Sequence, residues 1–110
     1  MITNKEANTT TITQEKVSII ELIRNIESDY DKFKNDHLII HLTSLDEIIL
    51  SDITAFLSIS STHRNAKKSF VIVSNKVDLV KIPNEIIIVP TIQEAYDIIE
   101  MEDIERDLGF

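Results

Sequence analysis

The sequence contains no cysteine, no tryptophan and a single glycine, Gly109. The lack of cysteine excludes disulfide bonds, thiolate zinc sites and cysteine nucleophiles. Loops that bind the phosphates of nucleotides need glycine, because their backbone must approach the ligand closely. Nucleotide binding by a P-loop or by the dinucleotide-binding turn is therefore excluded.

Basic residues are also few: there are 11 lysines and arginines against 19 acidic residues, and the formal net charge is −8. The nearest approach to a basic cluster, Arg64, Lys67 and Lys68, is too small to form a patch. This charge argues against nucleic acid or an anionic membrane as the main partner. No apolar run approaches the roughly 18 residues of a membrane span, and residues 1–6 have no apolar signal region. We expect a soluble, cytoplasmic protein.

What the chain does contain is a regular alternation of apolar runs and amphipathic segments. Its 110 residues, 43 % of them apolar, suit one compact domain. The expected strands are 9–13, 38–42, 70–73 and 86–89. Helices are expected over 18–33, from 51 to about 68, after Ser74-Asn75 (a short helix stopped by Pro83) and from Thr91 onward. Strands with apolar residues on both faces predict an α/β fold with a four- to five-stranded, mostly parallel sheet.

Three parts of the chain are distinguished by composition. Residues 1–8 are polar and are expected to form a flexible N-terminus. Residues 9–13 are rich in β-branched side chains and are interpreted as a strand at the edge of the sheet. Residues 9–101 are expected to form the single domain. Residues 102–110 are expected to be an acidic extension of the last helix.

Serine and threonine mark the expected helix starts. Ser18 with Glu21, and Thr91 with Glu94, have the spacing of a capping box, in which a hydroxyl and an acid satisfy backbone N–H groups at the helix start. Ser51 follows the apolar run 48–50, and its hydroxyl would cap the central helix, which is worth about 1 kcal/mol. A phosphate on this hydroxyl would add up to about two negative charges. Ser51 is therefore interpreted both as a cap and as a candidate switch.

No group of residues has the spacing of a catalytic or metal site. His37 and His41 would face the same side of one strand, but without an accompanying acidic motif a structural role is favoured over metal binding. The acidic residues show no pair with diagnostic spacing: Asp29, Asp31, Asp46, Glu47 and Asp52. Ser51 lacks the small flanking residues of a hydrolase nucleophile. The sequence predicts no enzyme, no catalytic residue, no metal and no cofactor.

The last helix is strongly acidic. Residues 94–110 contain seven acidic residues and one arginine, a net charge of −6. An apolar stripe, Met101, Ile104 and Leu108, runs through this acidity. It is interpreted as a docking surface for a basic partner, as a contact of a homodimer, or as a tail that packs on its own domain.

The run from His37 to Val73, followed by Pro90 to Ala95, resembles the STAS domain of sulfate transporters and anti-sigma factor antagonists. The resemblance covers roughly residues 9–101 and implies a sheet of four or five strands with alternating helices. In bacterial anti-sigma factor antagonists, a partner that is both kinase and anti-sigma factor phosphorylates the first serine of an Asp-Ser-Ser-Gly corner, and phosphorylation releases that partner. Ser51 matches this serine, and Ala55 and Leu57 match the small and leucine positions that follow.

The phosphorylation motif is degenerate in this chain. Leu50, Asp52 and Ile53 stand where the family has aspartate, serine and glycine, and a shift of one residue would make Asp52 a fixed charge at the switch position. The resemblance implies a non-enzymatic regulatory domain that binds a protein partner, such as an anti-sigma factor kinase. The residues expected to contact it are Ser51, Asp52, Thr54 and Phe56. The alternative is an accessory subunit or dimerising module that docks through Met101, Ile104 and Leu108 without phosphorylation.

Overall fold

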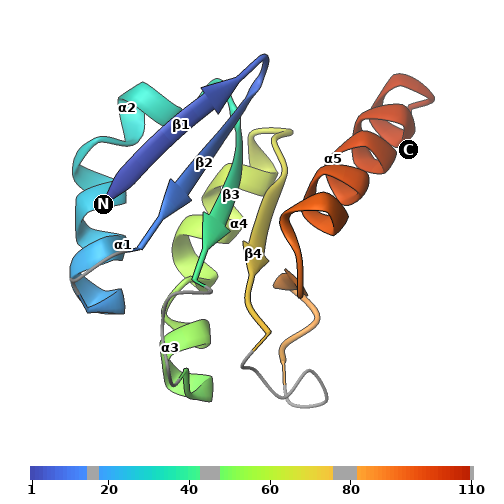
Figure 1. Cartoon of the computed structure of the whole chain (residues 1–110). Coiled ribbons are helices and arrows are strands. Elements are labelled where there is room, and N and C mark those ends of the chain that lie inside the picture. The colour runs from blue at the N-terminus through green and yellow to red at the C-terminus, as the bar shows by residue number, and fades with distance from the viewer. Residues whose placement is uncertain (15–17, 43–47, 76–81, 110) are drawn as a thin grey trace.

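The computed structural model describes residues 1–14, 18–42, 48–75 and 82–109. After an initial pair of strands, pairs of helices separate β2 from β3 and β3 from β4, and one long helix follows the last strand (Figure 1). In order, they are β1 (Ile2–Glu6), β2 (Thr9–Thr13), α1 (Ile19–Ser28), α2 (Tyr30–Phe33), β3 (His37–His41), α3 (Leu50–Thr54), α4 (Leu57–Asn65), β4 (Phe70–Val73), β5 (Ile87–Val89) and α5 (Ile92–Asp107). The short helix expected after Ser74-Asn75 falls on residues 76–81, outside the described residues.

The strands form one mixed sheet with the order β1-β2-β3-β4-β5. Strands β2 to β5 are parallel, and β1 is antiparallel to β2. The α/β class and the mostly parallel sheet are therefore confirmed. The two central strands β3 and β4 are buried on both faces, as their continuous apolar runs predict.

The helices cover the two faces of the sheet unequally. Alternate strand residues such as Leu38, Ile40 and Ile72 pack with α1, α3 and α4 in the larger core. The intervening residues, Ile39 and Val71 among them, pack with α5 on the other face. Figure 1 shows α5 standing apart from the other helices on the side of β4. Among the described residues, no helix has both the length and the apolar character needed to cross a membrane.

Strand β1 is the clearest difference from the expected organisation. The sequence predicted a flexible segment at residues 1–8, but residues 2–6 pair with β2, which is consequently not an edge strand. A two-residue turn joins the strands, with Ala7 in the left-handed region at φ 52°. Lys5 Nζ lies 3.2 Å from Asp36 Oδ1, and Thr10 donates a 3.0 Å hydrogen bond to Asp36 Oδ2. These contacts fix the hairpin to the segment before β3.

The two long helices expected over 18–33 and from 51 to about 68 are each divided. The first breaks at Asp29, between α1 and α2, and the second breaks after Thr54, between α3 and α4. The predicted caps at Ser18 and Thr91 are confirmed, because each hydroxyl accepts a 3.2 Å hydrogen bond from a backbone N–H three residues later.

Candidate functional site

The start of α3 differs from the helix cap that the sequence predicts. Ile49, with φ −103° and ψ 165°, is the N-cap residue, and Ser51 is the second residue of the helix. The Ile49 side chain has no hydrogen-bond acceptor and cannot cap the helix. A side chain from the first turn of the helix forms the stabilising hydrogen bond instead. Asp52 Oδ2 accepts a 3.1 Å hydrogen bond from the Ile49 N–H. The prediction that Ser51 caps this helix is wrong: its hydroxyl is available on the surface, and Asp52 stabilises the turn instead.

Two large apolar side chains lie on the surface beside Ser51. Ile49 is 53 % exposed and Leu50 is 44 % exposed, and Ser51 is exposed as well. Asp52 and Thr54 are half-buried, and the Thr54 hydroxyl donates a 3.1 Å hydrogen bond to the Ser51 carbonyl. We call residues 49–52 the α3 turn.

Phe56, which was expected to contact a partner, has no exposed surface. The chain turns after Thr54, and this turn directs the ring into the larger core, where its centroid lies 6.2 Å from that of Phe70. A partner could not reach Phe56 without unfolding the helix. The expectation that Phe56 belongs to a binding surface is therefore wrong, and its role is to anchor the segment that follows the α3 turn.

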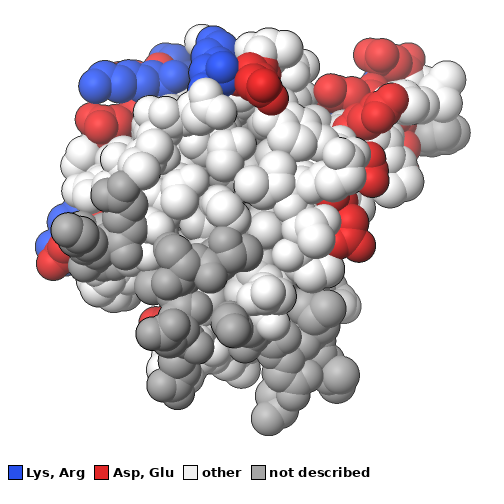
Figure 2. Space-filling model, in the orientation of Figure 1, with Lys and Arg blue, Asp and Glu red and all other residues white. Residues whose placement is uncertain are grey.

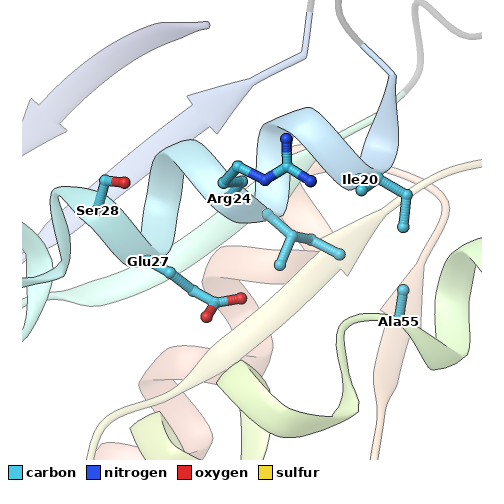
Figure 3. Close-up of a pocket in the computed structure, with 6 residues that line it drawn as sticks. Ile20, Arg24, Glu27, Ser28 and Ala55 are labelled. Carbon is cyan, nitrogen blue, oxygen red and sulfur yellow. The ribbon is translucent and has the colours of Figure 1, made fainter.

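A groove lies where α3 ends. It encloses about 570 Å³ between α1 and Ala55. Its lining residues are Ile20, Ile23, Arg24, Glu27, Ser28 and Ala55. Figure 3 shows Ile20 on α1 across from Ala55, with Arg24 and Glu27 along the same helix. Ile20 is 56 % exposed although it lies in an amphipathic helix, so it adds a large apolar side chain to the otherwise polar α1 rim formed by Arg24, Glu27 and Ser28.

A second group of polar side chains fixes α5 to the ends of β3 and β4. Glu102 accepts a 2.8 Å hydrogen bond from Arg64 and a 2.6 Å hydrogen bond from the Ser69 hydroxyl. Arg106 donates 3.0 Å hydrogen bonds to Ser69 and to Asp103. Burial of Glu102 opposes its ionisation, but the bonds from Arg64 and Ser69 and the charges of the two arginines outweigh burial and hold its pKa below the usual range.

These contacts change the description of the acidic tail. The sequence predicts that residues 102–110 extend the last helix, and α5 does continue without a break to Asp107. Glu102 and Arg106 are bonded to side chains of the domain, so this part of the helix is fixed along one side. The predicted apolar stripe lies in the solvent: Met101 is 51 % exposed, Ile104 is 54 % exposed and Leu108 is 67 % exposed.

The geometry of His37 supports the structural role favoured from sequence. Its Nδ1 accepts a 2.9 Å hydrogen bond from the Ser69 backbone N–H, and its Nε2 lies 3.0 Å from Asp103 Oδ1. Nδ1 therefore carries no proton and Nε2 donates, so both ring nitrogens have protein partners. His41, the second histidine of this strand, is partly buried, and burial lowers its pKa below the usual value. Within the part of the chain that the structure describes, no three histidine or carboxylate side chains are grouped to hold a metal.

The residues that sequence reasoning missed are Ile20, Ile49 and Leu50. For Ile49 and Leu50, the sequence did contain a signal of surface exposure. Residues 48–50 are all apolar, and three consecutive residues at a helix start cannot all face the core. Ile48 is buried, and the next two are exposed. A scan against protein-family models found no match, and a search of the curated proteins found none either.

Proposed function

We propose that this chain is a non-enzymatic regulatory domain that binds a protein partner through the α3 turn. The observation that carries the proposal is the exposure of two consecutive apolar side chains, Ile49 and Leu50, immediately before an exposed serine. Apolar residues gathered on the surface mark sites of interaction more often than single exposed ones do. The groove beside Ala55, with Ile20 on its rim, would receive side chains of the same partner.

Ser51 supplies the regulation in this proposal. A phosphate there would place up to about two negative charges beside Leu50 and next to the carboxylate of Asp52. An apolar contact surface would then bear a strongly hydrated group, and binding would be lost. The resemblance to anti-sigma factor antagonists supports the same position and suggests a kinase of the anti-sigma factor class as the partner.

A charge within the α3 turn should abolish co-purification of the partner. We expect Leu50→Asp and Ser51→Glu each to reduce, by about tenfold or more, the amount of a protein that co-purifies from the native host, because a central contact is worth about 2 kcal/mol or more. Quantitative mass spectrometry of the co-purified material measures this loss. Ser61→Glu is the matched control, since Ser61 is exposed on α4 outside the groove lining.

Two outcomes would contradict the proposal. If Leu50→Asp retains every protein that the unmodified chain retains, the α3 turn is not the binding surface. If Leu50→Asp loses the partner but Ser51 carries no phosphate in any growth state by intact-mass measurement, the surface stands and regulation by phosphorylation does not.

A further inference from the structure

The outward face of α5 carries an apolar stripe that nothing in the described structure covers. Ala95 and Ile99 are buried against the sheet, at 0 % and 4 % exposure. With 100° between successive helical residues, Met101, Ile104 and Leu108 lie on the opposite side of the helix. Their exposed fractions, all above one half, agree with that placement. The stripe is therefore separate from the contacts that attach α5 to the domain.

Acidic residues border this stripe on both sides. The same helical geometry places Glu100 and Asp107 along one side and Glu105 along the other. None of the ion pairs among the described residues includes these three carboxylates. Arg106, the only basic residue of α5, is held by Asp103 and Ser69 on the inner side. Figure 2 shows the acidic side chains gathered over α5 without a basic residue among them.

A hollow of about 420 Å³ adjoins the stripe, between α5 and the β1–β2 hairpin. Ile104 and Glu100 line it together with Glu6 and Tyr96, and the Tyr96 hydroxyl donates a 3.2 Å hydrogen bond to Glu6. The hollow contains no lysine or arginine in its lining. The hollow extends the apolar stripe toward the sheet, and the charged residues in its lining are all acidic, like those that border the stripe.

We propose that the outward face of α5 is a docking surface, separate from the α3 turn, for an amphipathic helix of another protein whose apolar face is bordered by lysine and arginine. The stripe would bury the apolar face, and the carboxylates of Glu100, Glu105 and Asp107 would pair with the basic border. A second copy of this chain is the poorer occupant, because it would bring the same acidic border against itself.

The proposal is tested with a synthetic helical peptide that has leucines on one face and lysines on both borders. Titrated into isotopically labelled protein, it should shift the NMR signals of α5 and of the β1–β2 turn, and the affinity should fall as salt increases. A matched peptide with glutamate in place of lysine should not bind. Ile104→Asp should abolish binding of the lysine peptide without unfolding the protein, since Ile104 is more than half exposed.

Matched charge variants distinguish binding at this surface from a general attraction to the net negative charge of the chain. The triple variant Glu100→Gln, Glu105→Gln, Asp107→Asn should bind the lysine peptide about tenfold more weakly, at about half a kcal/mol for each exposed charge pair. The control removes three exposed acids elsewhere: Glu21→Gln, Asp31→Asn, Glu85→Gln. An equal loss in both triples overturns the proposal, as do signal shifts that lie outside α5 and the β1–β2 turn. A concentration-dependent dimer that Ile104→Asp abolishes would assign the stripe to a second copy and also overturn it.

Discussion

Replacing Phe56 with alanine is expected to lower the free energy of unfolding by about 3–5 kcal/mol, the usual cost of deleting a buried aromatic ring. Phe56 has no exposed surface and packs against Phe70 in the larger core. A loss of this size is a large part of the total stability of a small domain, which is about 5–15 kcal/mol. Urea denaturation followed by circular dichroism measures it.

Leu50→Ala is the control for this substitution, because Leu50 is 44 % exposed and lies only six residues away. We expect it to change the free energy of unfolding by less than about 1 kcal/mol. Equal losses in the two variants would show that Phe56 does not anchor the core. Phe56→Leu should fall between the two, because less volume is removed.

Acidification should destabilise the protein below about pH 6.5. His63 has no exposed surface, and its Nε2 lies 2.7 Å from the Asp36 carbonyl oxygen. A carbonyl only accepts, so Nε2 carries the proton and Nδ1 accepts the 2.6 Å hydrogen bond from the Tyr30 hydroxyl. Burial lowers the pKa of His63 below its ordinary value of 6.5, and burial likewise lowers that of His37 against the opposing effect of Asp103.

The sign of the effect follows from proton binding. In the unfolded chain these two histidines bind protons near pH 6.5, whereas in the folded chain they stay neutral to lower pH. The unfolded state therefore binds more protons in this interval, and stability falls as the pH falls, by up to about 1.4 kcal/mol per pH unit for each histidine. The lowered pKa of Glu102 adds a further loss when the pH falls below its ordinary value of 4.5.

Urea denaturation at intervals between pH 8 and pH 5 measures the slope. His63→Gln should reduce this slope by the contribution of one histidine, up to about 1.4 kcal/mol per pH unit. Glutamine can donate to the Asp36 carbonyl and accept from the Tyr30 hydroxyl, but it does not titrate. A stability that does not change across this interval would contradict the neutral, buried state of His37 and His63.

Local signals in the sequence predicted the elements whose evidence lies within a few residues. The caps at Ser18 and Thr91, and the fully buried strands β3 and β4, were all predicted from spacing and apolar content. Strand β1 was missed because its residues are exposed and, apart from Ile2, polar, and because its turn places Ala7, not glycine, at a positive φ. A polar strand at a sheet edge has no apolar alternation to reveal it.

The polar contacts of α5 could not have been predicted in the same way. His37, Ser69 and Asp103 are separated by more than thirty residues from one another in sequence, and only the pairing of β3 with β4 and the packing of α5 bring them together. The sequence also did not show which residues of the strand-to-helix corner are exposed. Phe56 and Ile53 are buried and Leu50 is exposed because of the direction in which the short helix α3 packs. That direction depends on tertiary contacts with Phe70 and the larger core.

Site-specific photo-crosslinking in living cells of the native host tests the α3 turn most directly. A photoreactive amino acid would replace Leu50 in one variant and Ser61 in another, since both positions are exposed and neither substitution disturbs the core. We predict that the probe at position 50 captures one defined protein, that the probe at position 61 does not, and that Ser51→Glu abolishes the capture. The same crosslinked protein at both positions, or none at position 50, would contradict binding through the α3 turn.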